Sequence, residues 1–440
     1  MTDSQITETK KHPWFWVPTL YFAEGVPYAV VMYISVIMYK NLGLSNASIA
    51  LYTSWLYLPW VIKPFWSPFV DIFKTKRFWI VITQLSLGAG FAGIAFTLQT
   101  SNIVRYSLAF FWLLAFSSAT HDIAADGFYM LGLDSHGQAF FVGIRSMFYR
   151  FAMILGQGIL IMFVGYVENY VKSGSVHNAS GSTGSVQIAW TVTFVFLALM
   201  FVMFSIYHTL VLPKPKDDVL HTLEPSQIIS EFIRTFVLFF KKKNIILIIS
   251  FLLLYRLGEA QLLKLATPFL LDAKTSGGLG LTTIQVGFVY GTVGVIALTI
   301  GGFLGGLAAA KDGLKKWIWW MFLAINIPHV LYIFMAFYRP DNYLIINCCV
   351  ALEQFGYGFG FSAYMMYMLY ISEGAYKTAH YAIATGFMAL SMMLPGLVSG
   401  YIQQFLGYKL FFVWIFLTMI PGYFIVRLLP IDSDFGKKRS

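Results

Sequence analysis

Twelve long apolar segments dominate this sequence, and they restrict its fold more than any other feature. A helix needs about 20 apolar residues to cross a bilayer, and lipid tolerates only helices or closed barrels. With 58% hydrophobic and 11% charged residues, the composition is that of a polytopic membrane protein. We therefore predict an all-α membrane protein with twelve transmembrane helices. The segments lie at 14–39, 47–69, 78–98, 106–131, 140–166, 187–212, 244–271, 283–309, 315–337, 342–371, 378–401 and 408–428.

The Lys and Arg residues between the segments predict the orientation in the membrane. An even number of segments places both termini on one side. If that side is the cytoplasm, 19 of the 30 Lys and Arg residues fall in cytoplasmic segments and six in outside segments. Cytoplasmic loops carry such an excess of positive charge, so both termini are expected inside the cell. The same loops explain the formal charge of +10, and no nucleic-acid partner is expected.

The longest cytoplasmic connection divides the chain into two halves of six segments. We predict a first six-helix bundle at 1–212, a linker at 213–243 and a second bundle at 244–440. The linker contains an amphipathic stretch, 228–240, which is expected to lie at the membrane interface. Two repeats of this kind around a central cavity are typical of secondary transporters.

Two loops at equivalent places in the halves, 67–77 and 306–316, carry similar polar patterns. Both resemble the signature of the major facilitator superfamily, an acid at a helix end followed by basic residues in a tight turn. The second copy has Ala310 in place of the acid. We expect these loops to latch the cytoplasmic side shut; positive loops without a gating role are the alternative. The latch residues are Asp71, Lys76, Arg77, Lys311, Lys315 and Lys316.

Charged residues inside apolar segments are costly and indicate function. Asp122 and Asp126 lie one helical turn apart within the fourth segment. The five embedded acids fall on the first, fourth, seventh and tenth segments, so we expect them to lie near one another and near two arginines. At about 1.5 Å per residue, six charges share the middle of a hydrocarbon core about 30 Å thick. These are Glu24, Asp122, Arg150, Arg256, Glu259 and Glu353.

The acids are candidates for proton coupling, and a static ion-pair network is the alternative. Asp122 is the main candidate, and Glu24, Glu259 and Glu353 are the others. Asp126 lies closer to the cytoplasmic mouth, so we expect it to help open or close that side.

The basic residues inside the apolar segments lie at different predicted depths, and we assign them different roles. Arg150 and Arg256 either hold substrate carboxylates or act as counter-ions for the acids. Arg145 lies near the cytoplasmic mouth and is assigned to gating. Lys63 and Lys264 are expected toward the membrane edges, where their long side chains can snorkel.

Motifs along most of the chain resemble the AmpG family of muropeptide permeases, a branch of the major facilitator superfamily related to acetyl-CoA transporters. They occupy residues 56–71, 118–127, 143–150, 254–260, 353–360 and 378–382. The resemblance implies the major facilitator fold, with two six-helix bundles around a central cavity. It also implies a bacterial inner-membrane importer, expected as a monomer, that uses a proton gradient and no other cofactor or metal.

The cargo implied by the resemblance is an N-acetylglucosaminyl-1,6-anhydro-N-acetylmuramyl peptide released by cell-wall turnover. A transporter of a CoA ester or another large anion is the alternative, followed by a receptor that does not transport. An enzyme is not expected, because the matched loops would have no role in one. Such a cargo is anionic and carries sugars. Four aromatic residues are candidates for stacking on sugar rings or for packing: Tyr21, Tyr28, Trp55 and Tyr255.

Overall fold

The computed structural model contains helices and no strand over the residues that it describes, which are 12–175, 181–215, 218, 225–374, 376–433 and 435–436. Ten helical stretches in this part are long and apolar enough to cross a membrane. One of them, Ala379–Leu428, contains two predicted segments, which are separated by a break at Gly407 (φ 69°). The predicted segment 47–69 forms two shorter helices interrupted at Leu56 and Tyr57. Every predicted segment is therefore helical.

The first half of the chain forms one bundle. Its α-helices are α1 (Val17–Ala29), α2 (Ser35–Asn41), α3 (Asn46–Trp55), α4 (Leu58–Phe73), α5 (Lys76–Thr97), α6 (Ile103–Gly132), α7 (Ser135–Ile154), α8 (Leu160–Tyr170) and α9 (Gly181–Val211). Short 3-10 or π-helical stretches accompany them: η1 (Pro13–Phe15), η2 (Val30–Ile34), η3 (Leu155–Ile159) and η4 (Val171–Ser175).

After α10 (Pro225–Phe240), the second half forms the other bundle. Its α-helices are α11 (Ile245–Leu254), α12 (Leu257–Leu271), α13 (Thr283–Val286), α14 (Val295–Asp312), α15 (Leu314–Asn326), α16 (His329–Tyr338), α17 (Tyr343–Ser372), α18 (Lys377–Leu417) and α19 (Met419–Leu428). The short stretches here are η5 (Lys274–Ser276) and η6 (Gly287–Gly294).

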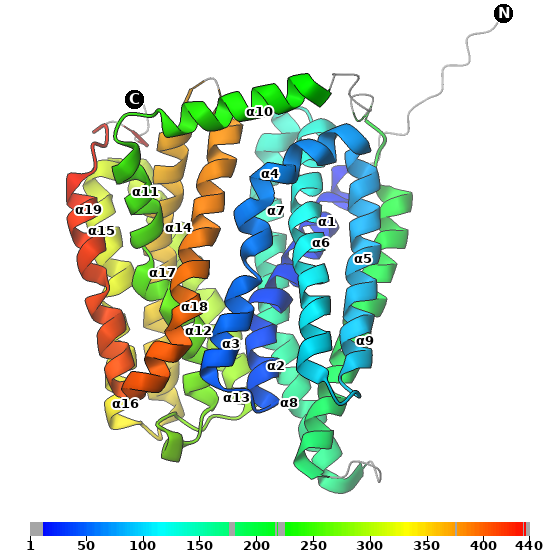
Figure 1. The fold of residues 1–440 in the computed structure, drawn as a ribbon, viewed down its shortest axis with the longest axis vertical. Helices are drawn as coiled ribbons and strands as arrows, with labels where there is room; N and C mark the ends of the chain where they lie inside the picture. Colours follow the sequence, from blue (N-terminus) through cyan, green and yellow to red (C-terminus); the bar gives the residue numbers. More distant parts are fainter. Residues whose placement is uncertain are drawn as a thin grey trace, which may run out of the picture.

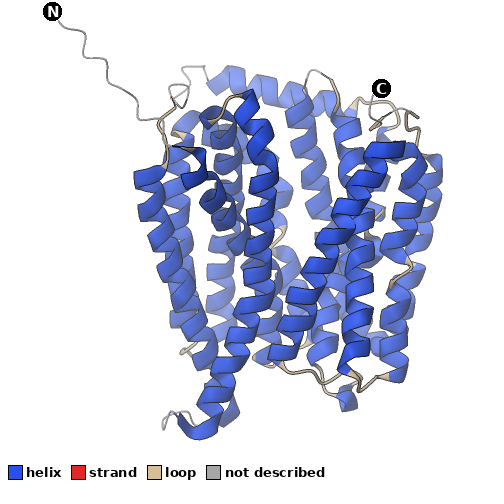
Figure 2. Ribbon diagram, turned by 180° about the vertical axis from the view of Figure 1, so that it is seen from behind, coloured by secondary structure: helices blue, strands red, loops and turns tan. Residues whose placement is uncertain are grey.

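The two bundles stand side by side, and α10 lies across one end of both (Figure 1). The view from behind shows the same two groups of roughly parallel helices (Figure 2). The start of α1 and the end of α19 lie at the end that α10 covers, which we call the linker end. The opposite end, placed outside the cell by the predicted orientation, is called the outer end.

Aromatic side chains attach α10 to both bundles. The ring of Phe236 lies 5.0 Å from that of Phe65 on α4, between ring centroids. The ring of Phe239 lies 6.2 Å from that of Phe387 on α18. The amphipathic stretch expected at the membrane interface is thus a helix that spans the gap between the first and second bundles.

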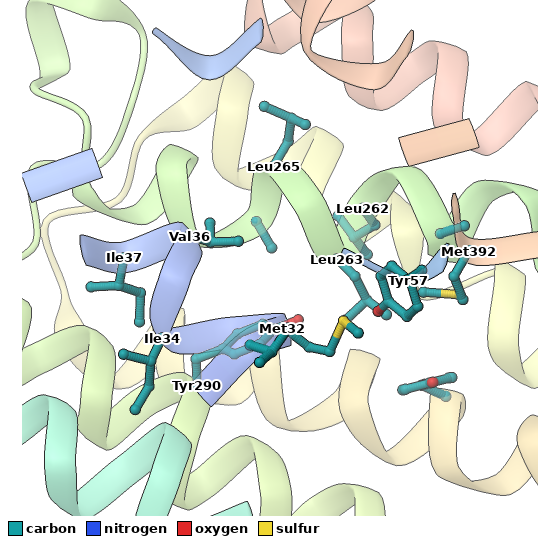
Figure 3. Packing of buried hydrophobic residues seen from close by; sticks show 14 of the residues in the cluster. Met32, Ile34, Val36, Ile37, Tyr57, Leu262, Leu263, Leu265, Tyr290 and Met392 are labelled. Atoms are coloured by element: carbon teal, nitrogen blue, oxygen red, sulfur yellow. The ribbon is translucent and has the colours of Figure 1, made fainter. Parts of the chain in front are cut away.

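Apolar residues of the two bundles meet in one continuous core. Figure 3 shows Met32 and Ile34 of η2 near Tyr290 of η6, and Tyr57 near Leu263 of α12. Burial of such surface contributes about 25 cal/mol per Å². The bundles are therefore packed together through α2, η2, α12 and η6 rather than held only by the linker.

Candidate functional site

Four charged side chains in the first bundle form two neighbouring ion pairs. Asp122 and Asp126 lie on one face of α6, and each has its own cation. Lys63 of α4 pairs with Asp122, and their side chains are 23% and 21% exposed. Arg145 of α7 places Nη1 3.1 Å from Oδ1 of Asp126. The position of Lys63 in the sequence predicts that it snorkels at the membrane edge. In the structure it instead pairs with Asp122, the main candidate for proton coupling.

Tyr21 of α1 completes the Asp126 pair. Its hydroxyl donates to Oδ1 of Asp126 at 3.0 Å and accepts from Nη1 of Arg145 at 2.8 Å. The Arg145 guanidinium also lies 4.6 Å from the centre of the Tyr21 ring and 5.0 Å from that of Tyr129. A cation between two rings is further stabilised by their π faces. Tyr21 therefore positions a charge pair, in addition to any contact with cargo.

Glu24 of α1 adds a third carboxylate to this cluster. It interacts electrostatically with Asp122, Asp126, Arg145 and Lys63. Its Oε2 atom is buried and has no hydrogen-bond partner among the described residues. Three carboxylates thus share two cations, so the fully ionised cluster carries one excess negative charge. In a medium of low dielectric constant, a proton can neutralise that charge.

The acids of the second bundle form a separate group. Oε2 of Glu259 on α12 lies 3.2 Å from Nε2 of His329 on α16, and both side chains are 1% exposed. Glu353 of α17 accepts from the amide of its neighbour Gln354 at 3.0 Å, and it interacts electrostatically with Glu259. The expectation of one cluster containing all five acids is therefore wrong. Each bundle encloses its own group of acids.

The two candidate substrate arginines have different surroundings, and neither forms an ion pair with an acid within the described part. Arg150 of α7 reaches across to the second bundle, where its Nη1 donates to the Thr299 hydroxyl of α14 at 3.3 Å. Arg256 lies at the break between α11 and α12, is 4% exposed and donates to the Tyr357 hydroxyl. Its guanidinium also lies 4.7 Å from the centre of the Phe361 ring. Both arginines keep hydrogen-bonding capacity that an anionic ligand can use.

The aromatic candidates are spread over the molecule. Tyr28 packs edge-on against Trp60, with 5.4 Å between ring centroids. Trp55 ends α3 and is 42% exposed. Tyr255 is buried inside the second bundle and donates to the Gly360 carbonyl at 2.9 Å. Its ring therefore serves packing in this conformation, whereas Tyr28 is half-buried and Trp55 is exposed.

The predicted latch residues are engaged within their own bundles. Arg77 donates to the Thr209 carbonyl of α9, and Asp312 lies 3.1 Å from Lys316 one turn away. The backbone amides of Lys76 and Arg77 donate to Asp218 of the linker at 2.7 and 3.1 Å. The Asp71 side chain lies outside the described part. Within the described residues, no hydrogen bond or ion pair of Lys311 or Lys315 joins the two bundles, so their gating role stays a prediction.

At the outer end, polar contacts join the two bundles directly. Nζ of Lys40 on α2 lies 2.6 Å from Oδ1 of Asp272, at the end of α12. Oδ2 of Asp272 accepts from the Tyr408 hydroxyl at 2.6 Å and from the Asn46 amide at 3.3 Å. The Asn46 amide also donates to Gln403 of α18 at 3.0 Å. We call these five residues the outer lock.

Backbone packing reinforces the closure of the outer half. A Cβ atom on Gly291 of η6 would lie 1.7 Å from the Gln157 carbonyl oxygen of η3, so only glycine allows this crossing. A Cβ atom on Gly400 would lie 2.5 Å from the Asn46 carbonyl oxygen. Both contacts join opposite bundles. The crossing is built from two π-helical stretches, η3 and η6, which are often found at functional sites.

Comparison with known proteins agrees with this architecture. The sequence matches the family model of the Major Facilitator Superfamily over residues 19–400. The chain belongs to this superfamily and is a multi-pass membrane transporter, which agrees with the expectation that it is not an enzyme.

Within the superfamily, the relatives confirm the resemblance to the AmpG branch. The anhydromuropeptide permease of Escherichia coli K12 is 23% identical over 429 residues, which cover 94% of this chain and 79% of that protein. The transporter AmpG 4 of Rickettsia felis is 24% identical over 433 residues, which cover 96% and 97%. At this identity the cargo of a relative does not transfer directly to this chain.

Solved structures of more distant transporters show the same fold. The D-xylose-proton symporter superposes with a TM-score of 0.71 at 14% identity, covering 97% of this chain and 99% of that chain. The nucleoside transporter NupG superposes with a TM-score of 0.68 at 14% identity, covering 94% and 98%. The predicted major facilitator fold is therefore confirmed.

Proposed function

We propose that this protein imports N-acetylglucosaminyl-1,6-anhydro-N-acetylmuramyl peptides together with protons, by alternating access across a bacterial inner membrane. Similarity to the anhydromuropeptide permease over nearly the whole chain supports the cargo. In this proposal the protein works as a monomer with both termini in the cytoplasm. The proton gradient supplies the energy, and no cofactor is required.

The observation that carries the proton coupling is the excess of acids over bases in the first-bundle cluster. Among the described residues, Glu24, Asp122 and Asp126 share the two cations Lys63 and Arg145. One bound proton balances these charges, and its release restores a net negative charge that is costly away from water. Loading and unloading the cluster can therefore bias which conformation the bundles adopt.

The anionic cargo has two candidate partners, Arg150 and Arg256, whose guanidinium groups form no ion pair with a carboxylate among the described residues. Planar guanidinium groups bind carboxylates with two parallel hydrogen bonds. A CoA ester also presents several anionic groups, so a transporter of such an ester is the second candidate. A receptor that binds without transporting is a third possibility that the same experiment distinguishes.

Uptake into proteoliposomes tests the proposal. Labelled anhydro-muropeptide should accumulate when an inward proton gradient is imposed, and a protonophore should stop the accumulation. Binding without accumulation would contradict transport and favour a receptor. Accumulation that persists after the gradient collapses would contradict proton coupling. Uptake of a labelled acyl-CoA in place of the muropeptide would favour the second candidate.

A further inference from the structure

Lys264 of α12 is a buried base that belongs to neither the first-bundle nor the second-bundle group of acids. Its side chain is 2% exposed, in contrast to the membrane-edge position that its place in the sequence predicts. Nζ donates to the Thr53 hydroxyl of α3 at 3.1 Å and lies 4.9 Å from the centre of the Tyr57 ring. Thr53 and Tyr57 belong to the first bundle, whereas Lys264 belongs to the second. This lysine therefore spans the interface that must open when the bundles rock.

The surroundings of Lys264 are apolar and closely packed. Leu262 and Leu263 of α12 lie near Tyr57 and Met392, as Figure 3 shows. On α18, a Cβ atom at Gly396 would lie 2.3 Å from Oγ of Ser54 and 3.4 Å from Cε of Lys264, so the backbone of α18 lies directly against this part of α3 and the lysine. The lysine is therefore enclosed by α3, by the break between α3 and α4, and by α18.

The acids on α12 are engaged elsewhere. Glu259, five residues before Lys264, pairs with His329, and Asp272, eight residues after it, pairs with Lys40 of α2 and with Tyr408 of α18. Among the described residues, no charged group lies close enough to act on the amine.

The other helices packed on α12 supply no counter-ion. No titratable side chain lies on α13. Lys315 and Lys316 of α15 and Arg427 of α19 lie at helix ends on the linker side, and Tyr423 of α19 packs on Trp319. In the described part of residues 46–73, the titratable group that contacts the amine is Tyr57, at the break between α3 and α4.

A charged ammonium without a carboxylate is unfavourable in such a place, whereas a neutral amine keeps its hydrogen bond to Thr53. The Thr53 hydroxyl itself donates to the Ile49 carbonyl at 2.8 Å, so its oxygen is directed to accept from Lys264. When the outer half opens, Thr53 and Tyr57 move away with the first bundle and water can reach the amine. The proton affinity of Lys264 is thereby tied to the conformation.

We propose that Lys264 is a proton-carrying residue of the transport cycle: its amine binds a proton when the outer end opens and gives it up when the bundles close on it. This inference deepens the proposed proton coupling and rests on it. Tyr57 interacts with Tyr28 of α1, which lies within electrostatic range of Asp122. Lys264 therefore lies against a pair of tyrosines that also senses the charge of the acidic cluster.

The test needs no cargo. Cysteines at Ser101 and Thr275, on outer-end loops of opposite bundles, carry spin labels in a background with Cys348→Ala and Cys349→Ala. Lowering the pH from about 8 to about 5.5 should lengthen the distance between the labels, because protonated Lys264 leaves its closed site. Lys264→Met should lose about half of this response or more.

The matched control is Lys409→Met. Lys409 is exposed near the outer end, with its Nζ atom 5.3 Å from the centre of the Phe337 ring, and this variant should keep the full response. A full pH response in Lys264→Met would overturn the proposal. Should that variant fail to fold, Thr53→Val removes only the acceptor and should shift the midpoint of the response by about half a pH unit or more. An unchanged midpoint would also overturn the proposal.

Transport separates this inference from the proposed function. In proteoliposomes, Lys264→Met should exchange labelled anhydro-muropeptide at equilibrium but accumulate about tenfold less under a proton gradient. If the wild-type protein does not take up this cargo, the proposed cargo is wrong. The distance between the spin labels still tests the role of Lys264, because that measurement needs no cargo. If Lys264→Met accumulates cargo like the wild type, only the role of Lys264 is wrong.

Discussion

Lys40 and Asp272 join the two bundles at the outer end, with 2.6 Å between Nζ and Oδ1. The corresponding charges at the linker end, Arg77 and Lys316, make their contacts inside their own bundles. The polar contacts between the described residues therefore close the outer side. An importer has to break these contacts once in each cycle to admit cargo from outside.

Asp272→Asn should shift the protein toward an open outer end. The variant loses the ion pair with Lys40 and weakens two further hydrogen bonds. A partly exposed ion pair contributes about 1 kcal/mol, so the population with an open outer end should rise about fivefold. Distances between spin labels at Ser101→Cys and Thr275→Cys measure this population.

A second ion pair at the outer end provides the control for this variant. Lys274 pairs with Asp341, but both residues belong to the second bundle, and their side chains are 43% and 90% exposed. Lys274→Met should leave the distances unchanged. Equal opening in both variants would mean that surface charge, rather than the contact between bundles, sets the conformation.

Asp122→Asn should separate accumulation from exchange. Without an ionisable group the variant should lose concentrative uptake, yet cargo should still exchange across the membrane at equilibrium. Asp126→Asn should instead slow both modes because Arg145 loses its partner, and it should also change the pH dependence because one of the three carboxylates that share two cations is removed. Both variants are assayed by uptake and by counterflow. Wild-type pH dependence in Asp122→Asn would exclude it as the coupling residue.

Lys63→Met should destabilise the first bundle by leaving Asp122 without its cation. Since both side chains are about one-fifth exposed, we expect a loss of about 2 kcal/mol, less than for a fully buried pair. The double variant Lys63→Met/Asp122→Asn should lose less than the sum of the single effects. Thermal unfolding in detergent measures all three. The surface pair of Lys172 and Glu168 supplies the control, because Lys172→Met should cost less than about 0.5 kcal/mol.

Gly291→Ala should prevent the outer half from closing fully. Its new Cβ atom would overlap the Gln157 carbonyl, so the two bundles would have to separate at the crossing of η3 and η6. We expect uptake to fall at least about tenfold, with the outer end more accessible to thiol reagents. Gly306→Ala is the matched control, because nothing lies within 4 Å of a Cβ atom there. Normal uptake in Gly291→Ala would show that the crossing tolerates separation.

Most of the fold could be predicted, because a bilayer imposes a simple length and polarity on every crossing. The position of Asp122 and Asp126 on one helix face also follows from their spacing. The cations that pair with these two acids cannot be predicted from the spacing. Lys63 and Asp122 lie 59 residues apart, and only the packing of α4 against α6 brings them together.

Depth along a helix also proved a poor guide to burial. Glu259 and Asp122 are both predicted in the middle of the hydrocarbon core, yet the structure encloses Glu259 with His329 and leaves Asp122 partly exposed beside Lys63. Which way a residue faces depends on helix rotation, and the break at Arg256 changes that rotation within one crossing. Lys264 is a second example: its distance from the helix end predicts access to water, yet its side chain is buried.

Proton movement measured together with cargo movement tests the proposed mechanism most directly. Proteoliposomes that contain a pH-sensitive dye, held at equal pH on both sides, receive anhydro-muropeptide outside. If the cluster of Glu24, Asp122 and Asp126 couples the two movements, the lumen should acidify as cargo enters, and Asp122→Asn should abolish the acidification. Entry of cargo with no change in the pH of the lumen would contradict proton coupling.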